Sequence, residues 1–178
     1  VSSDFLGILK SEFPELKGVL LADLSDKLGV NLILDWVKSN WGSVDYCFAN
    51  AGKASYAPAT DQDWANMEQL FQLNVHSPIQ LGLALKRLFP AHPLRHVITS
   101  SAIAYWAIPG YSLYSSTKAA LLQWADCLWA ERDGDWLTLV FPIATATAFF
   151  DAAGPNIPRA FPIQSPQQVA KSILSGAA

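Results

Sequence analysis

Apolar residues recur at intervals of three and four in several stretches of the chain, which predicts amphipathic helices. These stretches are residues 3–13, 26–40, 61–89, 112–132 and a tail after Pro166. In the second stretch the apolar positions are Leu28, Leu32, Ile33, Trp36 and Val37. Pro14 ends the first stretch, because proline removes a helical hydrogen bond.

Short, continuous apolar runs lie between the helical stretches and predict buried strands. The runs are residues 17–24, 44–49, 96–100 and 136–141. Strands that alternate with helices indicate βαβ units around a parallel sheet. Continuous apolar runs are typical of a sheet covered on both faces. The predicted fold class is therefore α/β, with a parallel sheet in a three-layer arrangement.

Composition narrows the class of protein further. The chain has 178 residues, of which 51% are hydrophobic and 15% charged, so we predict a single domain over residues 1–178. The formal net charge is −3 with no basic stripe, which argues against a nucleic-acid partner. Charged residues, glycines and prolines interrupt every apolar run before the ~20 residues that span a bilayer. The first residues have no signal-peptide pattern, so the expected location is the cytoplasm and no membrane partner is predicted.

Cysteine and histidine positions do not predict a metal site. Cys47 and Cys127 are far apart and lie in apolar segments, so we interpret both as small buried side chains. His92 and His96 are four positions apart, but Pro93 lies between them and prevents a shared helical face.

Polar residues follow each predicted strand. They are Asp23, the turn Asn50-Ala51-Gly52, the pair Ser100 and Ser101, and the pair Thr145 and Thr147. Ligands of parallel α/β sheets bind at the carboxyl ends of the strands. These residues are therefore the first candidates for a binding site.

Tyr114 and Lys118 are the strongest candidates for chemistry. They are four positions apart in a predicted helix and share one face. At ~4 Å and an effective dielectric of about 20, an ammonium attracts a phenolate by roughly 4 kcal/mol before solvation costs. That attraction could lower a tyrosine pKa by up to about three units. Ser101 ends a strand ahead of Tyr114, and Asn74 interrupts an apolar helix, where it requires a local kink or a bound water.

The motifs occur in the order typical of the short-chain dehydrogenase/reductase family, which the chain resembles. Phe48-Ala49-Asn50-Ala51-Gly52 resembles the NNAG turn of the family, and Leu73-Asn74-Val75 resembles its catalytic-asparagine segment. Thr99-Ser100-Ser101 resembles its strand-end serine, and Tyr114-Ser115-Ser116-Thr117-Lys118 is its YxxxK motif. Together the motifs extend over most of the chain.

The resemblance implies a Rossmann-like, doubly wound parallel sheet and an NAD(P)-dependent oxidoreductase, with NAD and NADP left open. Tyr114 would exchange a proton with the substrate oxygen, and Lys118 would lower the tyrosine pKa and hold the nicotinamide ribose. Ser101 would orient the substrate oxygen, and Asn74 would fix a water in a proton relay. Hydride would pass between the nicotinamide and a carbonyl or secondary alcohol carbon.

The resemblance also implies a set of residues that bind the cofactor. Asp23, with Leu24 beside it, would hold the adenine, and the turn Asn50-Ala51-Gly52 would pass close to the cofactor. Pro142, Thr145 and Thr147 would lie at the nicotinamide, with Thr147 as the best match to the threonine that contacts the carboxamide.

Two features depart from the family pattern. The family begins with a strand and a glycine-rich turn that cradles the pyrophosphate, and none of the ten glycines form such a turn. We expect that turn, with the first two strands, to precede Val1 in a longer protein. Ile143 follows Pro142 where the family usually has glycine.

The resemblance also indicates the kind of substrate and the oligomeric state. Trp106 and Tyr111 lie where the family has part of its substrate pocket, which indicates an apolar or aromatic substrate. Trp124 and Trp129 lie on the helix that packs against a partner subunit in the family, which indicates a homodimer or homotetramer.

Two other functions remain open. The chain could be a non-catalytic, nucleotide-sensing or structural relative, and the missing glycine-rich turn favours that alternative. Epimerisation or dehydration of a nucleotide sugar is disfavoured, because the tail after Phe150 is too short for the substrate domain of those relatives.

Overall fold

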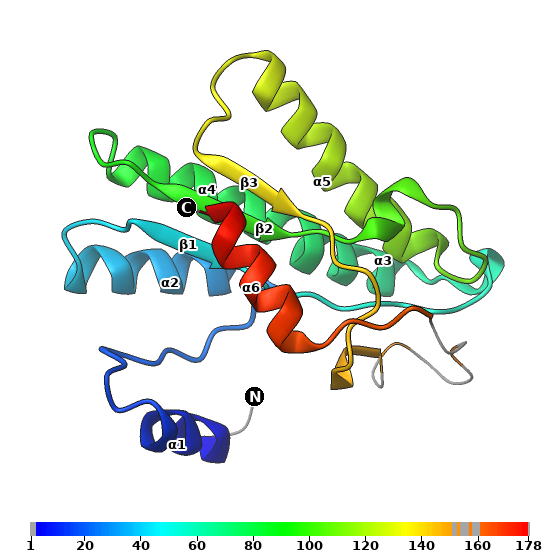
Figure 1. The fold of residues 1–178 in the computed structure, drawn as a ribbon, viewed down its shortest axis with the longest axis horizontal. Helices are drawn as coiled ribbons and strands as arrows, with labels where there is room; N and C mark the ends of the chain where they lie inside the picture. The colour runs from blue at the N-terminus through cyan, green and yellow to red at the C-terminus, as the bar shows by residue number, and fades with distance from the viewer. Residues whose placement is uncertain (1–2, 151–152, 154–156, 158–160, 178) are drawn as a thin grey trace.

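Three parallel strands form the centre of the protein in a computed structural model that describes residues 3–150, 153, 157 and 161–177 (Figure 1). The strands are β1 (Tyr46–Ala49), β2 (Arg95–Thr99) and β3 (Leu137–Val140), in the order β1-β2-β3. Cys47 pairs with His96, and His96 pairs with Leu137. The predicted strands at 44–49, 96–100 and 136–141 are therefore confirmed to within two residues at each end.

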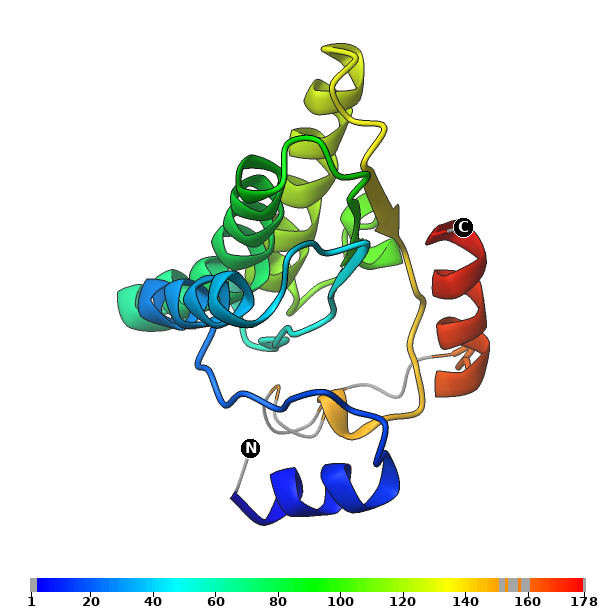
Figure 2. The same ribbon diagram turned by 90° about the vertical axis from the view of Figure 1, so that its left-hand side faces the viewer.

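Helices cover both faces of this sheet, which confirms the predicted three layers (Figure 2). One face carries α2 (Lys27–Asn40), α3 (Trp64–Phe71), α4 (Ser77–Leu88) and α5 (Ser112–Ala130). The other face carries α6 (Pro166–Ala177), which contacts β2 and β3. Helix α1 (Ser3–Glu12) lies apart, at the end of the molecule opposite the start of β3. Short 3₁₀ turns occupy Ala59–Asp61, Ala102–Tyr105 and Ala148–Phe150.

Two apolar clusters hold these layers together. The larger lies around the sheet and includes Val37, Ile98 and Leu121. The second lies beside the carboxyl end of the sheet and includes Leu70, Leu113 and the ring of Tyr114. The candidate site therefore rests against an apolar cluster of its own.

The prediction of a strand at residues 17–24 is wrong. Residues 18–23 are irregular, and Leu21 is 53% exposed. A strand requires a neighbour that accepts its ladder hydrogen bonds, and β1, the nearest edge of the described sheet, pairs only with β2. The segment instead passes α2, where Gly18 packs against the Trp36 ring.

The predicted helix at 26–40 is confirmed, but part of its predicted buried face is wrong. Asp26 caps α2 by accepting a hydrogen bond from the Leu28 amide at 2.9 Å. Leu28 and Leu32 are 63% and 46% exposed, whereas Val30 and Val37 are 5% exposed. Positions 30, 33, 34 and 37 follow the helical repeat and form the buried face, with 28 and 32 on the side away from it.

The long helical region predicted at 61–89 is two helices joined by a π turn at Gln72–His76. Asn74 lies in this turn and is 1% exposed, so the helix departs from regular α-helical geometry where the sequence predicted a local kink or a bound water. A π turn widens the helix by one residue and disturbs the regular hydrogen-bond ladder.

The two cysteines differ from each other. Cys47 is half-buried in the larger cluster, where burial raises the pKa of its thiol to about 12. Cys127 is exposed on α5, so the prediction that it is buried is wrong. It lies at a position of α5 that faces away from the sheet, which the apolar sequence around it did not reveal.

Among the residues described by the structure, no group of histidines, cysteines and carboxylates is arranged to hold a metal ion. None of the described helices combines the length and the apolar character needed to cross a membrane.

Candidate active site

The carboxyl ends of the three strands meet at one cavity of about 480 Å³. The residues that follow β1, β2 and β3 all contribute to its wall, as expected for a parallel sheet. The predicted site residues that line it are Asn50, Gly52, Ser101, Tyr114, Lys118, Pro142, Thr145 and Thr147.

Tyr114 and Lys118 lie together in the first two turns of α5. Both are nearly buried, at 5% and 4% exposure. The Lys118 Nζ lies 5.7 Å from the centroid of the Tyr114 ring and donates a hydrogen bond to the Thr99 carbonyl at 2.9 Å. The predicted pairing of ammonium and phenol on one helical face is therefore present.

Burial changes the proton affinity of both groups. It raises the pKa of Tyr114 to about 12, an effect that hydrogen bonding with Ser101 opposes and Tyr111 reinforces. Burial also lowers the pKa of Lys118 to about 8. The sequence predicted a lowered tyrosine pKa, whereas in the protein alone desolvation by burial outweighs the hydrogen bond with Ser101 and the pKa is raised.

Ser101 lies at the start of the turn Ala102–Tyr105. Its Oγ accepts a hydrogen bond from the Ile103 amide at 3.3 Å and donates one to the Pro142 carbonyl at 3.4 Å. The Ala102 amide donates to the same carbonyl at 3.0 Å. The segments after β2 and β3 are thus fastened to each other beside the Tyr114 phenol.

Asn74 lies behind the turn that follows β1 and does not line the cavity. Its Oδ1 accepts from the Lys53 amide at 3.0 Å, and its Nδ2 donates to the Lys53 carbonyl at 2.9 Å and to Thr117 Oγ1 at 3.1 Å. A Cβ on Gly52 would lie 3.3 Å from the Asn74 Oδ1 and 3.8 Å from the Lys118 Nζ. Both amide protons of Asn74 are therefore used to hold the turn against α5.

Two threonines belong to the same network and were not identified from the sequence. Thr117 is fully buried, and its hydroxyl donates to the Tyr114 carbonyl at 2.7 Å. Thr99 donates from its hydroxyl to Asn50 Oδ1 at 2.8 Å, which joins β2 to the turn after β1. Thr117 lies inside the YxxxK motif, but the motif alone does not indicate that this position is buried.

Three of the predicted cofactor residues lie outside the cavity. Asp23 is exposed, and its carboxylate accepts hydrogen bonds from the Ser25 amide and hydroxyl at 2.9 and 2.7 Å, which lower its pKa. Leu24 packs against the larger cluster, and its carbonyl accepts from Ser77 Oγ at 2.6 Å. Ala51 is exposed. The structure does not bring these three residues to the cavity that contains Tyr114.

The two threonines after β3 help to shape the cavity wall. Thr145 Oγ1 donates to the Ile143 carbonyl at 3.1 Å. Thr147 Oγ1 accepts from the Phe149 amide at 3.3 Å and so starts the turn Ala148–Phe150. Ile143 itself lines the cavity.

The chain matches a known protein family over the region that carries these motifs. The family model described as enoyl-(acyl carrier protein) reductase matches residues 8–132, which is more than half of the chain. The chain belongs to the short-chain dehydrogenase/reductase family.

Named relatives are oxidoreductases of this kind. The "Uncharacterized oxidoreductase YbbO" of Escherichia coli K12 is 35% identical over 107 residues, which are 58% of this chain and 40% of that protein. The "17-beta-hydroxysteroid dehydrogenase 13" of Mus musculus is 26% identical over 89% of this chain and 53% of that protein. The chain thus spans about half the length, or less, of these relatives.

Solved structures confirm the Rossmann-like fold. A short-chain dehydrogenase from Streptomyces avermitilis has a TM-score of 0.83 at 23% identity, over 98% of this chain and 71% of that one. An alcohol dehydrogenase from the archaeon Thermococcus sibiricus, complexed with 5-hydroxy-NADP, has a TM-score of 0.81 at 21% identity. That match covers 97% of this chain and 74% of that one.

Proposed function

We propose that the protein is an NAD(P)-dependent oxidoreductase that transfers a hydride between nicotinamide and a carbonyl or secondary alcohol carbon, with Tyr114 as the general acid and base. The observation that carries this proposal is the buried group of Tyr114, Lys118 and Ser101 at the carboxyl ends of the strands. Family membership and relatives named as oxidoreductases support it.

The residues around the cavity fit the nicotinamide and ribose end of such a cofactor. Lys118 offers a buried ammonium with one described protein partner, the Thr99 carbonyl, and so keeps donors for ribose hydroxyls. Gly52 keeps the wall open, because a side chain there would approach Asn74 and Lys118. Thr147 would hold the carboxamide, and Asp23 with Leu24 the adenine. When bound, the cofactor supplies or accepts the hydride.

In the reducing direction, the hydroxyls of Ser101 and Tyr114 would hold the substrate carbonyl oxygen. Tyr114 would donate its proton to that oxygen, and the Lys118 ammonium would stabilise the phenolate that forms. A general acid at this position contributes about 10²–10⁴-fold to a rate. Ser101 would turn its proton from the Pro142 carbonyl to the substrate, since that hydrogen bond is long at 3.4 Å.

The contacts of Asn74 change the role that we propose for it. Its amide protons are used by Lys53 and Thr117, so a relay water would bind its Oδ1 or the main chain of the π turn. We propose that its first contribution is to fix the turn 50–53 beside Lys118.

Exchange of Tyr114 for phenylalanine tests the proposal. Tyr114→Phe removes the acidic proton and keeps the ring, so turnover of a panel of aldehydes and ketones with NADH or NADPH should fall at least ~10²-fold. The melting temperature should stay near that of the wild type. Tyr105→Phe is the matched control, because Tyr105 is 61% exposed, and it should keep full activity. Wild-type turnover by Tyr114→Phe would refute the assignment.

A non-catalytic, nucleotide-sensing or structural role is the alternative. Titration of the intrinsic fluorescence of NADPH separates the two functions. Binding together with turnover supports the enzyme, whereas binding without turnover of any carbonyl in the panel supports the alternative.

We propose an apolar substrate. Phe149, Phe150 and Ile143 line the cavity beside Tyr114, and burial of apolar surface there would favour a hydrophobic carbonyl compound. The names of several relatives refer to apolar substrates, among them a hydroxynaphthalene reductase and an epidermal retinol dehydrogenase. In a series of ketones of increasing size, KM should fall as apolar surface grows, and a flat series would contradict this.

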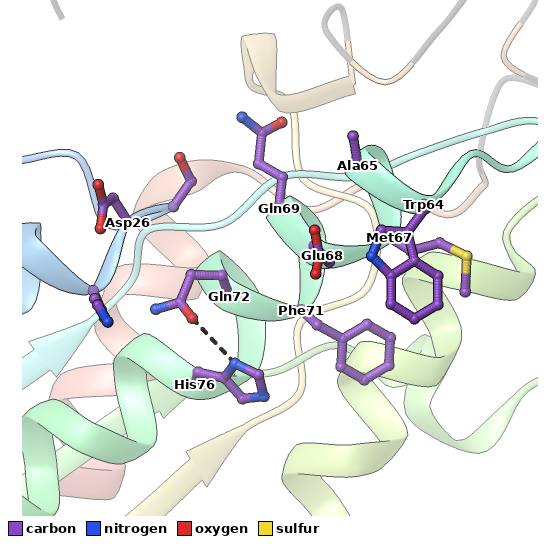
Figure 3. A pocket seen from close by; sticks show the side chains of 11 residues that line it. Asp26, Trp64, Ala65, Met67, Glu68, Gln69, Phe71, Gln72 and His76 are labelled. Carbon is purple, nitrogen blue, oxygen red and sulfur yellow. Dashed lines mark hydrogen bonds between the residues drawn. The ribbon is translucent and has the colours of Figure 1, made fainter.

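We also propose a homo-oligomer, as the exposed apolar side chains on α3 and α5 indicate. Trp64 is 73% exposed, Met67 37% and Trp129 40%. Figure 3 shows Trp64, Met67 and Phe71 on one side of a broad pocket of about 860 Å³. Asp26, Lys27, Glu68 and His76 also line this pocket. A surface with both signs of charge can match a second copy of itself across a twofold axis.

Light scattering during size-exclusion chromatography tests the oligomer. Trp64→Glu should dissociate it to monomers. Trp106→Glu is the matched control, because Trp106 is 58% exposed on a different turn, after β2. Monomeric wild-type protein, or an equal effect of both variants, would contradict this surface.

A further inference from the structure

The Tyr114 ring packs against two other aromatic rings. The Tyr111 ring is 6.2 Å away between centroids, at an angle of 59°, and the Phe149 ring is 6.1 Å away at 54°. Both angles are those of tilted aromatic packing, which is favourable at these distances. Phe149 belongs to the turn after β3, so the enclosure joins two segments far apart in the sequence.

Tyr111 is itself held in place from behind. It is 7% exposed, and the Tyr56 ring packs against it at 4.9 Å between centroids. Tyr56 in turn lies against the backbone of Gly110, where a Cβ would come within 2.3 Å of Tyr56 Cε2. The Ala57 amide donates to the Gly110 carbonyl at 2.9 Å. Tyr111 therefore has little freedom to move away from Tyr114.

Two titratable groups contact the Tyr114 ring, and a third lies behind one of them. They are Lys118 on α5, Tyr111 at the start of α5, and Tyr56 behind Tyr111. Lys118 favours the phenolate, while a second phenolate on Tyr111 would oppose it. Exclusion of water by the rings also opposes it, because a phenolate loses more hydration on burial than a phenol.

We propose that Tyr111 is a positioning residue whose ring, together with that of Phe149, keeps water from Tyr114 and so holds the proton on the Tyr114 oxygen. The site is thereby prepared to donate a proton, which is the direction of carbonyl reduction. This inference rests on the proposed function for its catalytic meaning, but the enclosure and its effect on the proton exist in the protein alone.

The experiment is an NMR titration of protein labelled with ¹³C at the tyrosine Cζ, without cofactor, with Tyr114→Phe used to assign the Tyr114 signal. A pKa near 12 leaves about one tenth of Tyr114 ionised at pH 11. Tyr111→Ala should lower the pKa by about one unit, which raises that fraction to about one half. Tyr111→Phe keeps the ring and should stay close to the wild type.

Phe149→Ala provides a second route if Tyr111→Ala does not fold. It removes the Phe149 ring, which lies in the turn after β3, and the pKa of Tyr114 should fall in the same way. Tyr105→Ala, at an exposed tyrosine, is the control and should leave Tyr114 unchanged. An unchanged Tyr114 titration in both alanine variants would overturn the proposal. An equal shift in Tyr111→Phe would overturn it too, because it would assign the effect to the hydroxyl.

The proposed function and the proposed role of Tyr111 can be refuted independently of each other. Loss of turnover in Tyr114→Phe tests the catalytic role, whereas the titration needs no substrate. With an active enzyme, Tyr111→Ala should also move to lower pH the limb on which alcohol oxidation rises with pH, because Tyr114 acts there as the deprotonated base, and Tyr111→Phe should not.

Discussion

Removal of the Asn74 side chain should destabilise the protein more than any other exchange of a single asparagine tested in parallel. Asn74→Ala breaks three hydrogen bonds, to the Lys53 amide, the Lys53 carbonyl and the Thr117 hydroxyl. Asn74 is 1% exposed and Thr117 is fully buried, so water cannot readily replace these bonds. At about 1 kcal/mol for each bond, the free energy of unfolding should fall by roughly 3 kcal/mol.

Urea denaturation followed by circular dichroism measures this loss. For a domain of this size, roughly 3 kcal/mol corresponds to a fall in melting temperature of about 6–12 °C. Asn74→Asp is the closest isostere, since it can still accept from the Lys53 amide but cannot donate, and it should lose about two of the three bonds.

Asn40→Ala is the matched control. Asn40 is exposed at the end of α2 and donates one hydrogen bond to the Trp36 carbonyl at 2.7 Å. It should cost less than about 1 kcal/mol. Equal unfolding midpoints for Asn74→Ala and Asn40→Ala would refute the reasoning that Asn74 fastens the turn 50–53 to α5.

Two further results are expected. Gly110 has φ 83°, and a Cβ there would overlap the Tyr56 ring, so Gly110→Ala should cost about 1–3 kcal/mol in thermal denaturation, whereas Gly42→Ala, with open space around it, should not. His96 is fully buried, burial lowers its pKa, and its Nε2 lies 2.8 Å from the Pro78 carbonyl. The unfolded chain therefore binds this proton first, near pH 6.5, and the urea midpoint should fall as pH is lowered from 7 to 5. His96→Gln should have a flatter pH dependence, and an identical slope would exclude His96 as the source.

The sequence was sufficient for the parts of the fold that depend on local pattern. Helical spacing located α2, the α3–α4 region, α5 and α6, and continuous apolar runs located β1, β2 and β3. The residues after parallel strands could be expected at one edge without knowledge of side-chain positions, which is why Asn50, Ser101 and Thr147 were found together. The four-residue interval likewise placed Tyr114 and Lys118 on one face.

Tertiary structure decided whatever depends on neighbours distant in the sequence. The apolar run at 17–24 has the composition of a strand, but strand formation requires hydrogen bonds to an adjacent strand, and this run pairs with none of β1, β2 and β3. The exposure of Leu28 and Cys127 depended on where the sheet lies relative to their helices, which local spacing does not specify.

The chemistry of the site divides in the same way. Residue types and spacing determined that an ammonium and a phenol would be neighbours. Only the fold determined that Phe149, in the turn after β3, packs against the Tyr114 ring beside Tyr111. Burial raises the pKa of Tyr114, whereas the local pair alone would lower it. Proton affinity depends on the whole environment of a group, and that environment is assembled only when the chain folds.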